Sequence, residues 1–92
     1  MKNQLPAQFS DLERFCGKWL RTTEAGRNEV RISSTMEEIR DFYDVFLPRF
    51  EQIIGYLNRM PLDDLPELDR NLLTLTFSFV EASAPVERFN TP

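Results

Sequence analysis

The chain has 92 residues, of which 41% are hydrophobic and 28% are charged, and this balance is typical of a single soluble globular domain. Its net charge of -4 opposes the counterion release that drives binding to DNA or RNA, so we expect no nucleic-acid partner. The absence of histidine and the presence of only one cysteine, Cys16, exclude an internal disulfide and a zinc site built from cysteine and histidine.

The first helix is predicted over residues 5–21, followed by a weaker one over residues 23–32. Ser10 and Glu13 have the spacing of a capping box, in which the two side chains satisfy free N–H groups at a helix start. Apolar residues recur at the helical steps of three and four: Phe9, Leu12, Cys16 and Trp19. In the second segment Thr23 suits an N-cap, but the alternation that follows fits a helix poorly.

The strongest pattern in the chain is a heptad seam, which predicts a long helix over residues 35–60. Ser34 and Glu37 have capping-box spacing at its start. The seam alternates steps of three and four residues: Met36, Ile39, Tyr43, Phe46, Phe50, Ile53, Leu57 and Met60. Pro48 lacks the N–H of an ordinary residue and disfavours helical geometry at the residue before it, so we expect a kink there.

The last element is predicted over residues 65–83, and its type is less clear from the pattern. Leucines recur at helical spacing, but residues 73–79 also alternate as a strand would. Asp64 and Pro66 are typical of a helix start, and a lone strand would lack a sheet partner. We therefore favour a helix.

Pro85 is predicted to end this helix, so that residues 84–92 form a tail. Residues 1–92 then form one all-α domain, a small antiparallel helical bundle of three to four helices around the long, Pro-kinked central helix. The chain has no disulfide, so packing of side chains must hold this bundle together.

The residue types that most enzymes need are scarce. A serine or cysteine nucleophile requires a base, normally histidine, and the chain has none. The three glycines are isolated, and no glycine-rich phosphate loop or other cofactor motif is present. We therefore predict no enzyme activity and no cofactor, and we interpret Cys16 as a buried small apolar residue.

Four carboxylates follow one flank of the long helix: Glu37, Asp41, Asp44 and Glu51. This flank is either a solvated helix face or a docking stripe for a cation or a basic partner, and we assign no metal site to it. The first helix has a basic edge formed by Arg14, Lys18 and Arg21. Because the two surfaces have opposite charge, one hypothesis is that the basic edge of one copy pairs with the acidic flank of another.

The apolar arc of residues 36–60 is wider than the seam and too wide for contact with a single helix. We predict a non-catalytic helical interaction or accessory protein, which forms a homodimer or binds a partner protein through this arc. The interface candidates are Phe42, Phe46, Phe50 and Ile54. The alternative is a binder of a small apolar or aromatic molecule between helices, with Trp19, Tyr43 and Tyr56 as pocket candidates.

Three phrases of the sequence resemble those of a group of short, uncharacterised bacterial proteins: residues 34–44 (STMEEIRDFYD), 47–49 (LPR) and 61–66 (PLDDLP). The resemblance covers about residues 5 to 90. It implies a bacterial origin and a compact helical fold, and it carries no activity or site residue. The chain also has no apolar run that predicts a membrane span or an export signal, so we expect a cytoplasmic protein.

Overall fold

The structure is a computed structural model that describes residues 4–90, without the side chains of Leu62 and residues 85–90. A 3₁₀ helix, η1 (Ala7–Phe15), runs into the short α1 (Cys16–Trp19) and is followed by α2 (Glu24–Ser33), α3 (Met36–Phe46), η2 (Leu47–Arg49), α4 (Phe50–Leu57), η3 (Leu62–Asp64) and α5 (Glu67–Asn90). Residues 4–90 contain no strand, so the predicted all-α fold is confirmed.

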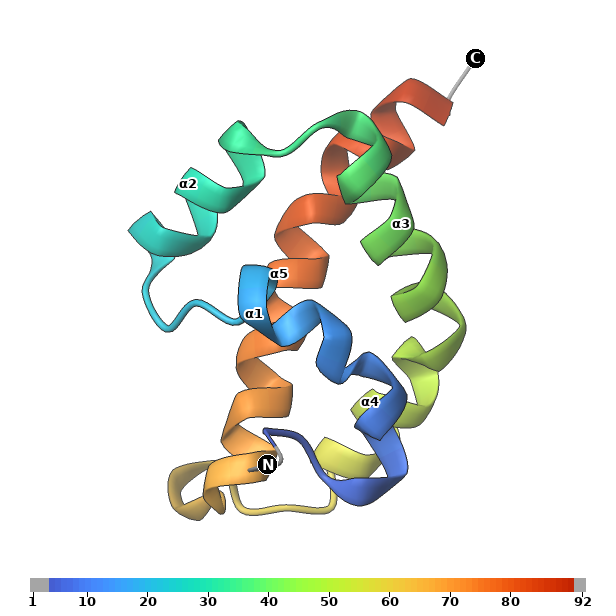
Figure 1. Ribbon diagram of the computed structural model, residues 1–92. Coiled ribbons are helices and arrows are strands. Elements are labelled where there is room, and N and C mark those ends of the chain that lie inside the picture. The colour runs from blue at the N-terminus through green and yellow to red at the C-terminus, as the bar shows by residue number, and fades with distance from the viewer. Residues whose placement is uncertain (1–3, 91–92) are drawn as a thin grey trace.

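The longest helix, α5, spans most of the molecule (Figure 1). At ~1.5 Å per residue, a helix of this length is about 36 Å long, and the longest dimension of the chain is 39 Å. α3 packs antiparallel to α5, and η1 with α1 packs against both of them. α2 lies apart from these elements, at one side of the bundle (Figure 1).

Aromatic rings form the centre of the core. The ring of Phe79 on α5 lies 4.6 Å from that of Phe46 and 6.3 Å from that of Phe42, both on α3. Trp19 of α1 stacks on the other side of Phe42, with an interplanar angle of 14°. Stacked and edge-on rings at such distances add specific attraction to the burial of their surface. These rings therefore join three elements from distant parts of the sequence.

The predicted long helix is interrupted at Pro48, where a kink was expected, and its two parts are separate α-helices. α3 ends at Phe46, residues 47–49 tighten into the 3₁₀ helix η2, and α4 follows. Proline has no backbone N–H to donate to the preceding turn, so the α-helical ladder is interrupted there. α4 ends at Leu57, so the helical segment stops before Met60.

The capping box at the start of α3 lies one residue later than predicted. The capping box of α3 is formed by Thr35 and Glu38: the Glu38 N–H donates to the Thr35 hydroxyl at 3.1 Å, and the Thr35 N–H donates to the Glu38 carboxylate at 2.8 Å. The prediction that Ser34 and Glu37 form it was therefore wrong by one residue. Thr23 is the N-cap of α2 as predicted, because its hydroxyl accepts from the Gly26 N–H at 3.0 Å.

The capping box predicted at Ser10 is also wrong: Ser10 follows a kink of η1 at Phe9, whose backbone angles are non-helical (φ -119°, ψ 22°), but the Glu13 carboxylate bonds elsewhere. The chain enters the 3₁₀ helix earlier, directly after Pro6, whose fixed φ suits that position. Glu13 instead accepts a hydrogen bond from the backbone N–H of Gln4 at 3.3 Å. The carboxylate thus fastens the extended N-terminal segment to η1.

The C-terminal helix extends further than predicted. Residues 73–79 are helical, as favoured from the sequence, but the helix also continues past Pro85 to Asn90. The predicted tail is therefore wrong for residues 84–90, and its last two residues lie outside the described part of the chain. Proline removes one backbone hydrogen bond and kinks a helix without always ending it.

Candidate interaction surface

A surface hollow of about 570 Å³ lies between α2 and α5. Its lining consists of Glu24, Ala25, Asn28 and Arg31 from α2 and Glu81 from α5. The two helices form its walls, and we call this hollow the α2–α5 groove. Most of its lining side chains are polar or charged, so the groove is more polar than the interior of the bundle.

α2 is held against the bundle by few side chains. None of its residues is buried, and Val30 is the one that packs against the core while half-buried. Arg27 makes the polar links: its Nε donates to the Glu81 carboxylate at 3.0 Å and its guanidinium donates to the Arg21 carbonyl at 3.3 Å. The same guanidinium lies 5.7 Å from the centre of the Phe77 ring. One arginine therefore connects α2 to the edge of α5.

Large apolar side chains are exposed on the two helices that form this groove. Phe77 and Val80 on α5 are 47% and 49% exposed, and Ile32 on α2 is 72% exposed. On α5 the two residues belong to a stripe with steps of four, three and four residues, which we call the α5 stripe: Leu73, Phe77, Val80 and Ala84. At about 100° per residue these four positions share one side of the helix. Leu73 is half-buried and Ala84 is exposed.

The interface candidates from the long helix lie elsewhere. Phe42 and Phe46 have 0% exposure and belong to the chain's own core, so the prediction that they form a docking face is wrong. Phe50 and Ile54 are half-buried, and the Phe50 ring lies 5.3 Å from that of Phe79. The apolar arc is wide because α5, η1 and α1 cover it within one chain.

The three pocket candidates have separate surroundings. Tyr43 stacks on Phe79 with ring centres 5.7 Å apart, and the Tyr56 hydroxyl donates to the buried Asp69 at 2.6 Å. This hydrogen bond raises the pKa of Tyr56. Trp19 is nearly buried and borders a hollow of about 180 Å³, which the other two do not line. The structure therefore does not bring the three together in one pocket.

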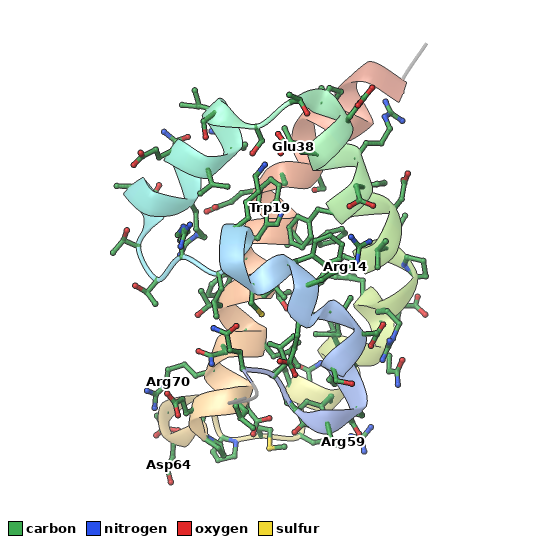
Figure 2. The ribbon with its side chains drawn as sticks, viewed as in Figure 1. Arg14, Trp19, Glu38, Arg59, Asp64 and Arg70 are labelled. Carbon is green, nitrogen blue, oxygen red and sulfur yellow. The ribbon has the colours of Figure 1, made fainter. Side chains whose placement is uncertain are left out.

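The basic edge of the first helix meets the acidic flank of α3 within the same chain. Arg14 pairs with Asp41 at 3.1 Å, and Lys18 pairs with Glu38 at 2.6 Å. Figure 2 shows Arg14, Trp19 and Glu38 around this contact. The hydrogen bond from Lys18 is the main cause that lowers the pKa of Glu38 to about 2. Arg14 and Lys18 of the basic edge and Asp41 of the acidic flank are therefore already paired in a single copy, so these charges give little reason for a second copy to bind here.

Cys16 and the carboxylates are the residues that could carry nucleophilic or metal chemistry in the described part of the chain. Cys16 is buried, and this burial raises the pKa of its thiol to about 11, so the reactive thiolate is scarce near neutral pH. Among the side chains that the structure describes, no group of three or more acidic or cysteine residues is arranged to hold a metal ion. In the same part of the chain, no helix is both long and apolar enough to cross a membrane.

No protein family, curated protein or solved structure matches the chain. The functional conclusion therefore depends on the structure alone, and in particular on the α2–α5 groove and the exposed apolar residues of the two helices that form it. Sequence reasoning missed the exposed Phe77 and Val80. Both residues belong to a series of apolar positions on α5 with steps of four, three and four residues. The leucines of the same helix, which form the core, made a stronger pattern in the sequence.

Proposed function

We propose that the protein is a non-catalytic helical interaction module that takes up one amphipathic helix of a partner protein in the α2–α5 groove. The observation that carries this proposal is the pair of half-exposed residues Phe77 and Val80 beside a groove whose outer wall, α2, contributes no buried residue. Adjacent exposed apolar side chains are a frequent mark of protein interaction surfaces. A partner helix would cover them.

The distribution of polar and apolar side chains favours a helix as the occupant. The lining of the groove is mostly polar, and the two helices that form it carry large exposed apolar residues, Phe77 and Val80 on α5 and Ile32 on α2. An amphipathic helix in a groove presents its apolar face to such walls at every third or fourth residue. A partner helix lying along α5 would contact apolar side chains from both walls.

A small apolar molecule is a weaker candidate for the same groove. A volume of about 570 Å³ lies within the usual range for ligand pockets. Such pockets, however, are lined mainly by apolar and aromatic side chains. Here Glu24, Arg31 and Glu81 are among the lining residues, and the aromatic Phe77 lies outside the lining. A protein helix therefore accounts better for the side chains present.

Site-specific photo-crosslinking tests this function. The photoreactive residue benzoylphenylalanine is placed at Phe77 in one variant and at Leu47 in a matched control, since Leu47 is similarly exposed at 46%. Leu47 lies in η2, and the segment that joins α3 to α4 lies on the side of the bundle away from α2 (Figure 1). Both variants are irradiated in the cells that produce them, and the adducts are sequenced by mass spectrometry.

The expected result is a protein adduct at Phe77 that is absent at Leu47, with the crosslinked peptide carrying apolar residues at helical spacing. Equal adducts at both positions would show nonspecific contact and would overturn the proposal. The absence of any protein adduct at Phe77 would overturn it as well.

A further inference from the structure

We propose that the helix taken up in the α2–α5 groove is α5 of a second copy, so that two chains pair antiparallel through their α5 stripes. This inference rests on the proposed function and names the partner for the same surface. The stripe consists of Leu73, Phe77, Val80 and Ala84. It lies on the described part of α5, beside the wall formed by α2.

The spacing of the stripe suits a helix partner. Its steps of four, three and four residues average close to the heptad period, at which apolar side chains of two helices stay in register along their contact. The core-facing residues of α5, such as Leu72, Leu75 and Phe79, occupy another side of the helix and are buried. α5 therefore has a second apolar face that its own chain covers only in part: Leu73 packs against the core, whereas Phe77, Val80 and Ala84 are exposed.

The order of side-chain sizes favours an antiparallel pair. A two-fold axis between Phe77 and Val80 places each Phe77 opposite the other copy's Val80, and each Leu73 opposite the other copy's Ala84. A large side chain then meets a smaller one at every level, which is the arrangement that fills space between packed helices. A parallel pair would instead place Phe77 against Phe77 and Ala84 against Ala84, which leaves uneven gaps. The stripe is thus complementary to itself in the antiparallel direction.

Charges beside the stripe do not oppose this pairing. The flanking positions are Thr74 and Glu81 on one side and Thr76 and Ser83 on the other. In the antiparallel register Thr74 lies near the other copy's Glu81, whereas Thr76 is buried within its own chain. These flanking positions, within the described part of α5, bring no two like charges together, and each Glu81 is already paired with Arg27 of its own chain at 3.0 Å.

The available area indicates a weak and reversible dimer. Phe77 is 47% exposed, which corresponds to roughly 100 Å² of side-chain surface. The remaining stripe residues are smaller, so the stripe alone provides less than the ~800 Å² per partner of a standard interface. Ile32, on the opposite wall of the groove, adds apolar surface. We therefore expect dimerisation that depends on protein concentration.

A complementation experiment tests the partner and its direction together. Sedimentation velocity is measured from about 1 µM to about 1 mM for the wild type, for F77E, for V80K and for an equimolar mixture of the two variants. In the antiparallel pair, position 77 of one variant faces position 80 of the other, so the mixture joins opposite charges. The exposed Leu47 supplies the matched control variant, L47E.

The expected result is that the wild type and L47E shift from a monomer of 10.8 kDa towards twice that mass as concentration rises. F77E and V80K alone should each weaken dimerisation by at least tenfold, and their mixture should recover most of it. A wild type that stays monomeric throughout would overturn the second copy as the partner. Loss in both variants without recovery in the mixture would overturn the antiparallel register.

Circular dichroism checks that both variants remain folded, which is expected because Phe77 and Val80 are half-exposed. F77S and V80S replace a charged variant that fails to fold, and each should still lose the dimer. The two proposals fail in distinguishable ways. A monomeric wild type that still forms a specific Phe77 photo-adduct with another protein would overturn self-pairing and retain the proposed function, whereas no dimer and no adduct would overturn both.

Discussion

The Nε atom of Arg27 on α2 donates to the Glu81 carboxylate on α5 at 3.0 Å, and this ion pair fixes the outer helix to the longest helix of the bundle. The two residues are separated by 54 positions in the sequence. α2 has no buried residue of its own, so the position of this helix depends strongly on a single side chain. Arg27 therefore supplies the ion pair that links the two helices of the α2–α5 groove.

Replacing Arg27 with alanine should loosen α2 without unfolding the bundle. The change removes the ion pair and the contact of the guanidinium with Phe77. We expect faster amide hydrogen exchange throughout α2, unchanged protection in α5, and a loss of about 1 kcal/mol or less in global stability. Arg31→Ala is the matched control, because Arg31 bonds to Asn28 within α2. Unchanged exchange in α2 of R27A would contradict this role.

Replacing Thr35 with alanine should destabilise the protein more than replacing Ser10. Thr35 caps α3 through both hydrogen bonds of its capping box, whereas Ser10 lies exposed inside η1. We expect T35A to lower the free energy of unfolding by about 1 kcal/mol, and S10A to change it by less than about 0.5 kcal/mol. Urea unfolding followed by circular dichroism measures both. Equal losses in the two variants would show that the cap at Ser10 also forms.

The ionised Glu38 should stabilise the fold only above acidic pH. Its pKa is lowered from 4.5 to about 2, first by the hydrogen bond from Lys18 and then by the backbone of Thr35. A carboxyl whose folded pKa is depressed contributes stability above its unfolded pKa and loses that contribution as the pH falls through its folded pKa.

The difference in unfolding free energy between the wild type and E38Q should therefore be constant above about pH 4.5 and should shrink as the pH falls to about 2. Measuring both proteins at each pH removes the effects of the other carboxylates from the difference. A difference that stays constant down to pH 2 would contradict the lowered pKa. An NMR titration of the Glu38 side chain provides an independent reading of the same value.

Replacing Tyr56 with phenylalanine should destabilise the protein by leaving a buried carboxylate without its hydroxyl partner. The hydroxyl donates to Asp69, which is buried near the start of α5. A buried polar group that loses its partner costs about 1 to 3 kcal/mol. Thermal unfolding should show the loss in Y56F, while Y43F should change little, since Tyr43 contacts Phe79 through its ring. A stable Y56F would indicate that the hydroxyl serves another purpose.

The sequence was sufficient for the helical fold because its periodic patterns are local. The heptad seam marks the helical surface that the core requires, and Pro48 marks the break in it. The same seam was a poor guide to the interface. Apolar residues at heptad spacing pack equally well against a helix of the same chain or of another, and here α5 fills the place of the partner.

The α2–α5 groove depends on a contact that local patterns do not encode. It forms because residues near Arg27 and residues near Glu81 approach each other in space. The basic edge and the acidic flank show the same limit: their complementarity was recognised, but Arg14 and Asp41 proved to belong to one copy. Charge patterns predict that two surfaces attract, and the fold decides which chain each surface belongs to.

The central place of Phe79 has a consequence for synthesis of the chain on the ribosome. This ring contacts Phe42, Tyr43, Phe46 and Phe50, so the aromatic core has its common neighbour near the C-terminal end of the sequence. A nascent chain that stops before α5 lacks the ring that these four side chains share. The ribosomal tunnel must therefore release α5 before the core can close, and until then aromatic side chains that α5 will cover are available to chaperones.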